Sequence, residues 1–290
     1  MRIIQYLDGE RKVLAAVTDD EAAYVLPDED FLALLHRAER QGITPGEAIA
    51  KCVETSRPVD GDWKALRLLA PVDAPEVWAA GVTYQRSREA RNHETEGKAE
   101  AGATVYDRVY EAARPELFMK STAARTVGPG GAVKLRGDSS WQVPEPELGL
   151  VLNGSGDIVG YTIGNDMSCR DIEGENPLYL PQAKIWKQSC SIGPAIRIAE
   201  SMADPYALDI ELRILRGEQA AVAITANTRL LKRRLEELVA YLKRDNMLFE
   251  GTVLLTGTCL VPPDDFTLQP GDVIEIGISG IGTLVNTVVA

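Results

Sequence analysis

Three carboxylates have the types and spacing that point most directly to chemistry in this sequence. Glu145 and Glu147 lie two residues apart in an apolar run, so both side chains leave the same face of a strand. Asp166 ends a second apolar run, and the Gly-rich stretch 154–157 between the runs predicts a hairpin. Symmetry about that turn places Glu145 opposite Asp166 and Glu147 opposite Gly164, where Cβ atoms of facing residues lie about 4.5–5.5 Å apart.

A cluster of three carboxylates needs neutralisation, because like charges in one place repel each other. A hard divalent cation with oxygen ligands supplies it, and a small ligand set with room for water favours Mg²⁺ or Mn²⁺ over a dedicated Ca²⁺ cage. The alternative is that these acids are surface charges or pair with Lys and Arg. A bulge at Pro146, which cannot donate to the ladder, would also shift the register. We interpret Glu145, Glu147 and Asp166 as metal ligands.

Composition limits the partners of such a site. The 290 residues carry a formal net charge of −12, which disfavours nucleic acid and anionic membranes but permits a small anionic substrate near a bound cation. Four scattered cysteines give no metal or redox spacing and predict reduced thiols. The sequence shows no signal-peptide pattern and no apolar run near the ~20 residues that span a bilayer, so we expect a cytoplasmic protein.

The elements that position the carboxylates fall into two parts. Three short apolar runs predict a small β-meander: residues 3–7, 13–17 and 22–26. Helical spacing follows over residues 31–38, and a second helix is expected to begin near Pro45. The polar stretch 57–62 is typical of a linker. We therefore expect a small amino-terminal α/β domain over residues 1–70.

The remaining chain, residues 71–290, is predicted to be the catalytic domain. An apolar run at 77–82 predicts a buried strand, and the polar segment 84–100 predicts a solvated helix with lid character or a partly disordered stretch. Beyond residue 115 the pattern is β-rich, with Gly and Pro punctuation. One helix is predicted over residues 228–241. The fold class is α+β with a large mixed or antiparallel β core.

Several motifs in order resemble the fumarylacetoacetate hydrolase family over roughly residues 75–290. They are Glu-Pro-Glu-Leu at 145–148, Gly-Tyr-Thr-Ile-Gly-Asn-Asp-Met-Ser-Cys-Arg-Asp at 160–171, and the Leu-Gln-Pro-Gly-Asp segment that runs from 268 to 284. The resemblance implies a mixed β-roll catalytic domain, a divalent metal that is usually Mg²⁺, and a homodimer or higher homo-oligomer. It also places the family's metal ligands at Glu145, Glu147 and Asp166.

The same resemblance implies two further site residues. Lys184, in Gln-Ala-Lys-Ile-Trp, stands at the family's active-site lysine, and Thr258, in Thr-Gly-Thr, matches a substrate-contacting threonine. Taken from composition alone, Lys184 would be a surface lysine and Thr258 a plain strand residue.

One departure from the family pattern bears on the reaction. Hydrolases of the family usually follow the tyrosine of their lid with a histidine and, three residues later, a glutamate. Here Ser87 and Ala90 stand at those positions after Tyr84. His93 and Glu96 keep the spacing six residues later, either as a displaced dyad or as a polar face of the lid. Histidine base catalysis is therefore poorly supported.

A dehydratase branch of the family fits this departure better. Tyr-x-Arg-Ser-Arg-Glu-Ala at 84–90 and the segment 171–184 resemble 2-keto-3-deoxy-D-arabinonate dehydratases, which convert a 2-keto-3-deoxy-pentonate to 2,5-dioxopentanoate. That resemblance implies proton-transfer roles for Ser87, Glu116 and Lys184. It also implies substrate contacts by Tyr84, Arg86 and Thr258.

These roles combine into one hypothesis. The substrate's carboxylate and 2-keto oxygen are expected to chelate the metal, whose Lewis acidity stabilises an enolate. Lys184, kept neutral by burial and a nearby cation, would take the C3 proton. Glu116 would protonate the departing C4 hydroxyl or position a water, and Ser87 would orient that hydroxyl. Closure of the segment 84–100 would exclude water.

Rival interpretations remain open at the level of sequence. An acylpyruvate or diketo-acid hydrolase would use the same scaffold and would depend on His93. A decarboxylase or an isomerase would share the metal site. A non-catalytic paralogue would bind metal or ligand without turnover.

Overall fold

The computed structural model describes residues 1–94 and 104–290, and within these the strands form three sheets. The large sheet has the order β3-β2-β1-β13-β11-β10-β16-β5-β6, with β4 paired to β1 and β7 to β13. Its strands are β1 (Arg2–Asp8), β2 (Arg11–Val17), β3 (Ala23–Val25), β4 (Arg67–Leu68), β5 (Glu76–Gly81), β6 (Glu116–Thr122), β7 (Thr126–Val127), β10 (Pro146–Leu152), β11 (Ile158–Asp166), β13 (Cys190–Ile198) and β16 (Thr252–Thr258).

The second sheet has the order β15-β14-β17-β18-β8, and β12 pairs with β9 in a small third sheet. These strands are β8 (Ala132–Lys134), β9 (Gln142–Val143), β12 (Ser168–Cys169), β14 (Asp209–Arg216), β15 (Gln219–Asn227), β17 (Val273–Ile278) and β18 (Gly282–Val289). Most ladders are antiparallel, whereas β16–β5, β13–β7 and β18–β8 are parallel. The predicted α+β class with a mixed β core is confirmed.

The amino-terminal part contains the predicted meander and both predicted helices, α1 (Phe31–Gln41) and α2 (Pro45–Thr55). Local signals fix their ends. Asp30 caps the start of α1, and Gly42 ends it in the left-handed region that favours glycine. Thr44 opens α2 with a capping box, and Pro45 occupies the first turn, where its missing N–H costs nothing.

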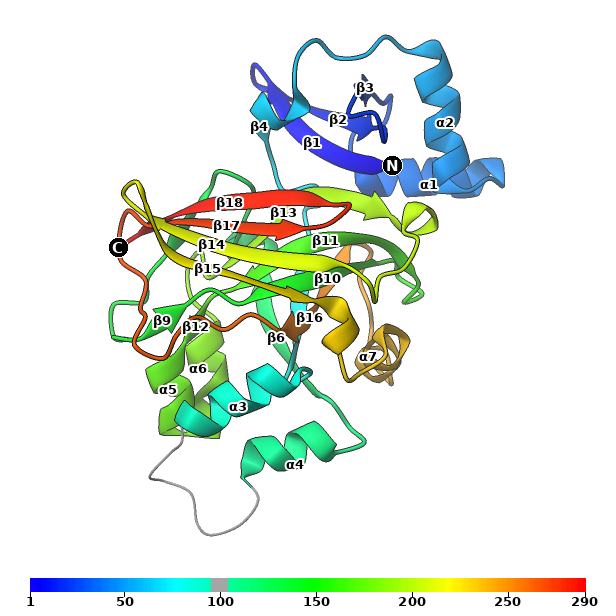
Figure 1. Cartoon of the computed structure of the whole chain (residues 1–290). Coiled ribbons are helices and arrows are strands. Elements are labelled where there is room, and N and C mark those ends of the chain that lie inside the picture. The colour runs from blue at the N-terminus through cyan, green and yellow to red at the C-terminus, as the bar shows by residue number, and fades with distance from the viewer. Residues whose placement is uncertain (95–103) are drawn as a thin grey trace.

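The large sheet runs across the predicted boundary between the two parts. β1 pairs with β13 through Arg2–Arg197 and Ile3–Ile196, so the meander and the β-roll share one sheet (Figure 1). Between Leu68, the end of β4, and Glu76, the start of β5, the chain forms no helix or strand. The division at residue 70 stays a prediction.

The acidic hairpin has the register that its sequence predicts. In the β10–β11 ladder Glu147 faces Gly164, and the N–H of Asp166 donates to the carbonyl of Glu145 at 3.0 Å. The one irregularity of this ladder lies near the turn, between Val151 and Leu152, and not at Pro146. The carboxylates therefore come together through strand pairing alone.

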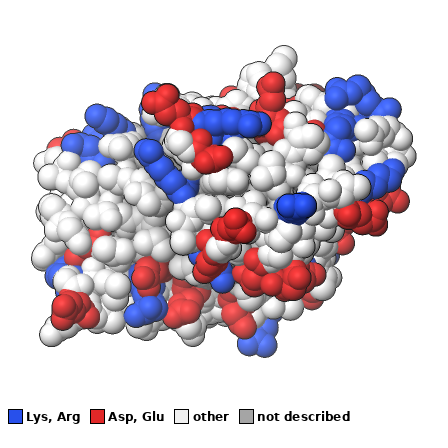
Figure 2. All heavy atoms as spheres, turned by 90° about the horizontal axis from the view of Figure 1, so that it is seen from above, with Lys and Arg blue, Asp and Glu red and all other residues white. Residues whose placement is uncertain are grey.

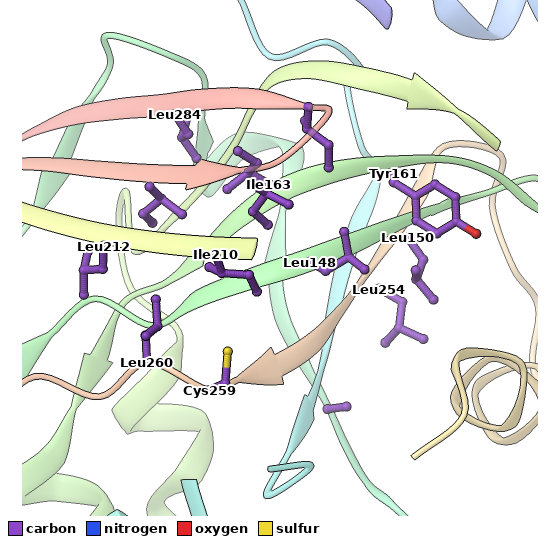
Figure 3. Packing of buried hydrophobic residues seen from close by; sticks show 14 of the residues in the cluster. Leu148, Leu150, Tyr161, Ile163, Ile210, Leu212, Leu254, Cys259, Leu260 and Leu284 are labelled. Carbon is purple, nitrogen blue, oxygen red and sulfur yellow. The ribbon is translucent and has the colours of Figure 1, made fainter. Parts of the chain in front are cut away.

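One face of this hairpin packs in the main hydrophobic core (Figure 3). Leu148 and Leu150 of β10 belong to one apolar cluster with Ile210, Leu212 and Leu284 of the second sheet. The alternation of side chains sends Glu147 to the other face of β10, together with Val151. Val151 belongs to a second apolar cluster that α1 also covers. Glu147 thus lies on the face that carries the second cluster.

The helix predicted over residues 228–241 is shorter than expected. A 3₁₀ turn comes first, then an extended stretch, and α7 is confined to Leu235–Leu242. The N–H of Lys232 donates to the carbonyl of Thr83 at 3.0 Å, and the Arg233 guanidinium donates to two carbonyls that follow α4 (Val105–Glu111). These tertiary hydrogen bonds hold the stretch extended against its helical periodicity.

Three further helices gather below the β core with α4: α3 (Gln85–Glu94), α5 (Arg170–Glu175) and α6 (Leu180–Lys184) (Figure 1). α3 accounts for the first part of the segment 84–100, but it buries one face instead of being fully solvated, since Ser87, Ala90 and Arg91 are buried. The rest of that segment lies outside the described residues.

Seen from above, acidic and basic side chains are interspersed without a continuous basic patch (Figure 2). Among the helices in the described part of the chain, none has the length and apolar character needed to cross a membrane.

Candidate active site

Three buried carboxylates meet at the open end of the acidic hairpin. Glu145 precedes β10, Glu147 lies on it, and Asp166 ends β11; each is at most 3% exposed. One oxygen from each carboxylate lies within 4.8 Å of the others. The hairpin register explains this convergence, since Glu145 and Asp166 face each other and Glu147 shares their side of the sheet.

Lys184, at the end of α6, places a fully buried ammonium among these acids. Its Nζ lies 2.5 Å from Glu145 Oε2, 3.2 Å from Asp166 Oδ2 and 3.3 Å from Glu173 Oε1. Burial opposes the charged form, but Asp166, Glu145 and Glu173 outweigh it and raise the pKa of Lys184 above its ordinary value. These three carboxylates favour the charged form of Lys184, and the neutral Lys184 expected beside a bound cation stays a prediction.

Two other buried cations pair with these carboxylates, and sequence reasoning missed both. Lys120 Nζ, on β6, lies 2.8 Å from Asp166 Oδ1, and Arg170 Nη2, at the start of α5, lies 2.8 Å from Glu145 Oε1. Although burial opposes it, the charges of Lys184 and Arg170 lower the pKa of Glu145. Arg170 was detectable in principle, since it follows Asp166 by four residues, whereas Lys120 lies in a distant strand.

Glu147 is the carboxylate that this arrangement leaves without a cation. Within the described residues it forms no ion pair, and its Oε2 accepts one hydrogen bond, from the N–H of Gly257 at 2.6 Å. Burial, with the nearby charges of Asp166 and Glu145, raises the pKa of Glu147 well above its usual range. A hard divalent cation beside Glu147 would relieve this repulsion, so the donor set fits Mg²⁺ or Mn²⁺.

α3 covers the carboxylates and encloses a small cavity of about 10 Å³. Ser87 and Arg91, one helical turn apart, line it from α3, while Phe118 of β6 and Thr258 of β16 line it from the sheet. Thr258 is buried and pairs with Glu147 across the ladder. The structure therefore brings Ser87, Lys184 and Thr258 of the predicted residues to the three carboxylates.

Glu116 lies beside this cavity at the start of β6. Its Oε2 is buried and has no hydrogen-bond partner among residues 1–94 and 104–290. Burial raises the pKa of Glu116, although the charge of Arg91 opposes the shift. A carboxyl with a raised pKa suits a proton donor. Facing it, Gly81 has no room for a side chain, because a Cβ there would lie 1.8 Å from Glu116 Oε2.

Three other predicted residues do not line the cavity. Tyr84 packs in the main hydrophobic core, and Arg86 is half exposed with its Nη1 4.0 Å from Glu89 Oε2. Arg86 precedes Ser87 by one residue, so the helix turns its side chain to another face. His93 is half exposed, with Nε2 3.6 Å from Asp264 Oδ2, and the predicted partner Glu96 lies outside the described residues.

Arg91 and Glu173 are site residues that sequence reasoning missed. Arg91 Nη2 of α3 lies 2.9 Å from Glu173 Oε1 of α5, and both side chains are almost fully buried. Helical spacing was a usable signal for Arg91, because it follows Ser87 by four residues. Glu173 gave no comparable signal, since its role depends on how α5 packs against α3.

A mixed β-roll that carries a buried carboxylate site beneath a helix defines a class of proteins with a divalent-metal site. Among known protein families, the model described as "Fumarylacetoacetate (FAA) hydrolase C-terminal" matches residues 77–289. The chain belongs to the fumarylacetoacetate hydrolase family.

Relatives align over nearly the whole chain. A "Probable 2-keto-3-deoxyxylonate dehydratase" of Haloferax volcanii is 45% identical over 97% of this chain and 96% of its own length. A "2-dehydro-3-deoxy-D-arabinonate dehydratase" of Saccharolobus solfataricus is 41% identical over 99% and 96%. A solved 2-keto-3-deoxy-D-arabinonate dehydratase complexed with magnesium and 2,5-dioxopentanoate superposes with a TM-score of 0.85 at 37% identity, covering 100% of this chain and 99% of that chain.

Proposed function

We propose that the protein is a Mg²⁺-dependent dehydratase that converts a 2-keto-3-deoxy-pentonate to 2,5-dioxopentanoate. The observation that carries the proposal is the set of side chains around the cavity. Ser87, Glu116 and Lys184 adjoin three buried carboxylates, while His93 lies outside. The names of the two relatives and the magnesium and product in the solved neighbour support the same activity.

Each residue of the candidate site has its own role in the proposed reaction. A divalent metal held by Glu145, Glu147 and Asp166 supplies Lewis acidity to a 2-keto group when bound. Lys184 passes a proton to Glu173, 3.3 Å away, and then takes the C3 proton.

Protonated Glu116 gives its proton to the C4 hydroxyl, which leaves as water, and Ser87 orients that hydroxyl. Loss of a C5 proton and protonation at C3 then give an enol, and protonation of this enol at C4 with loss of its hydroxyl proton gives the aldehyde. The hydrolase alternative has no such support, because His93 is half exposed beside Asp264.

We also propose that the protein is a cytoplasmic homodimer. A net charge of −12 and four free cysteines support the location. β15 supports the dimer, since it is an edge strand of nine residues without a charged side chain or a proline. Such an edge is ready to pair with the same strand of a second copy.

Turnover with magnesium tests the proposed activity. We expect the purified protein with Mg²⁺ to form 2,5-dioxopentanoate from a 2-keto-3-deoxy-pentonate, detected with a coupled NADP⁺-dependent dehydrogenase. Glu147→Gln should lower kcat/KM by at least about 100-fold, because it removes a metal ligand. Its circular dichroism and unfolding midpoint should stay close to those of the unchanged protein.

Glu211→Gln, at an exposed position of β14, is the matched control and should keep full activity. Full activity of Glu147→Gln would contradict the metal assignment. Release of pyruvate from an acylpyruvate, without aldehyde formation from the pentonate, would instead identify a hydrolase.

A further inference from the structure

Arg91 of α3 is the one arginine among the described residues that line the cavity. Its side chain is 3% exposed, and Glu173, which is fully buried, holds Nη2 at 2.9 Å. The guanidinium also stacks 5.5 Å from the centre of the Tyr106 ring of α4. A buried, planar donor group fixed by a carboxylate and a ring has a defined direction, which suits recognition of a ligand oxygen.

The two ends of the proposed substrate need different partners. Its carboxylate and ketone match the three carboxylates with their cation and Lys184, as an oxygen-liganded metal site requires. Its C4 and C5 hydroxyls need hydrogen-bonding groups instead. Ser87 and Arg91 on α3 offer these, since an arginine carries five N–H donors and a hydroxyl oxygen accepts.

Building on the proposed function, we propose that Arg91 recognises the hydroxyl end of the substrate and thereby determines specificity for 4-hydroxylated 2-keto acids. Its N–H groups donate to the hydroxyl oxygen at C4, beside the carboxyl of Glu116 that protonates this oxygen. A site built to hydrogen-bond a hydroxyl discriminates against analogues that lack it, because the buried donors are then left unpaired. Glu173 holds Arg91 in that direction.

The test compares two ligands and three variants. 2-Oxopentanoate has the same chain length as the pentonate but no hydroxyl, so it probes the metal end alone. Arg91→Met should lower kcat/KM for the pentonate by about 100- to 1000-fold, while the Kd of 2-oxopentanoate with Mg²⁺, measured by calorimetry, changes less than about threefold. Arg91→Lys should fall between, since it keeps the charge and loses the planar donors.

Arg88→Met is the matched control on the same helix, because Arg88 lies over Tyr110 outside the cavity and should leave both constants unchanged. If removing Arg91 leaves Glu173 unpaired and unfolds the protein, the Arg91→Lys values decide, because lysine keeps a cation beside Glu173. An equal loss of affinity for both ligands, or no change in kcat/KM, would overturn the proposal.

Failure of the proposed function gives a different result. An unchanged protein that binds the pentonate without converting it would refute the dehydratase activity. The ratio of Kd values for the pentonate and 2-oxopentanoate, with and without Arg91, would still decide the inference: a ratio that collapses in Arg91→Met supports it, and an unchanged ratio rejects it.

Discussion

Lys120 and Lys184 are both fully buried beside Asp166, yet they have different partners. Lys184 contacts three carboxylates and lines the cavity, whereas Lys120 donates to the carbonyls of Met167 and Lys184 and pairs with Asp166. Lys120 also lies 5.0 Å from the centre of the Trp186 ring. We infer that Lys120 fixes the end of β11 and the backbone of α6, so its contribution is to stability.

Removal of Lys120 should therefore destabilise the protein. Lys120→Met leaves Asp166 as a buried charge with one fewer cation, and we expect the free energy of unfolding to fall by about 3–5 kcal/mol. Urea unfolding measures this change.

Adding Asp166→Asn to the same chain should recover part of the loss, because the second substitution removes the charge that Lys120 neutralised. A loss below about 1 kcal/mol for Lys120→Met would show that Lys120 is not needed for this balance.

The carboxylates of the site follow from sequence, whereas its cations do not. Glu145, Glu147 and Asp166 belong to one hairpin, whose register depends on local pairing and a short turn. Lys120 arrives from a separate strand, β6, and its approach depends on packing that no spacing expresses. The carboxylate of Glu173, which lies 3.3 Å from Lys184, likewise comes from a separate element, α5.

At the scale of elements, local signals succeeded where the chain fixes its own ends. Caps at Asp30 and Thr44 define α1 and α2, and alternation defines the hairpin. They failed at residues 228–241, where hydrogen bonds from Lys232 and Arg233 to distant carbonyls override helical periodicity. α3 was expected to be solvated because its sequence is polar. Its polar side chains Ser87 and Arg91 are buried instead, because the site that α3 covers is itself polar.

The turn before β3 contains a carboxylate on which the amino-terminal part depends. Glu21 accepts a hydrogen bond from Trp63 Nε1 at 3.0 Å and pairs with Arg2 and Lys64. The Trp63 hydrogen bond, with these cations, lowers the pKa of Glu21 from 4.5 to about 2. A carboxyl with a lowered folded-state pKa stabilises the fold above its unfolded pKa and loses that effect as the pH falls through its folded pKa.

Glu21→Gln should accordingly be less stable than the unchanged protein at pH 7. The difference in unfolding midpoint should persist down to about pH 4.5 and shrink between pH 4.5 and 2, where Glu21 becomes protonated. Urea unfolding at a series of pH values measures it. A difference that is constant over this range would show that the ionised form of Glu21 makes no special contribution.

At the scale of the whole molecule, the proposed dimer depends on which sheet edge is free. The second sheet ends in β15 and the large sheet ends in β3. Sedimentation should give twice the chain mass of 31.5 kDa. Ala223→Lys, at an exposed position in the middle of β15, should shift the protein toward monomer because it places like charges across the two-fold pairing.

Val25→Lys is the matched control on β3 and should leave the dimer intact. Dissociation by Val25→Lys alone would place the interface at the other edge, and a monomeric unchanged protein would reject the dimer.

The continuity of the large sheet was not predictable from sequence. The meander and both helices of the first part are local, but the pairing of Ile3 with Ile196 joins positions far apart in the chain. The alternation of apolar and polar residues in β1 and in β13 does not indicate that these two strands pair with each other. The family resemblance predicted the β-roll. The pairing of the meander with the β-roll was seen only in the structure.

The cavity of about 10 Å³ has a kinetic consequence. A space of that size holds about one water molecule, so we expect α3 to withdraw Ser87 and Arg91 before a five-carbon acid enters. Ligand capture is then a two-step event, with a slow rearrangement before or after encounter. The observed association rate should level off at high ligand concentration, and crystals of the complex should be obtained by growth with ligand more readily than by soaking.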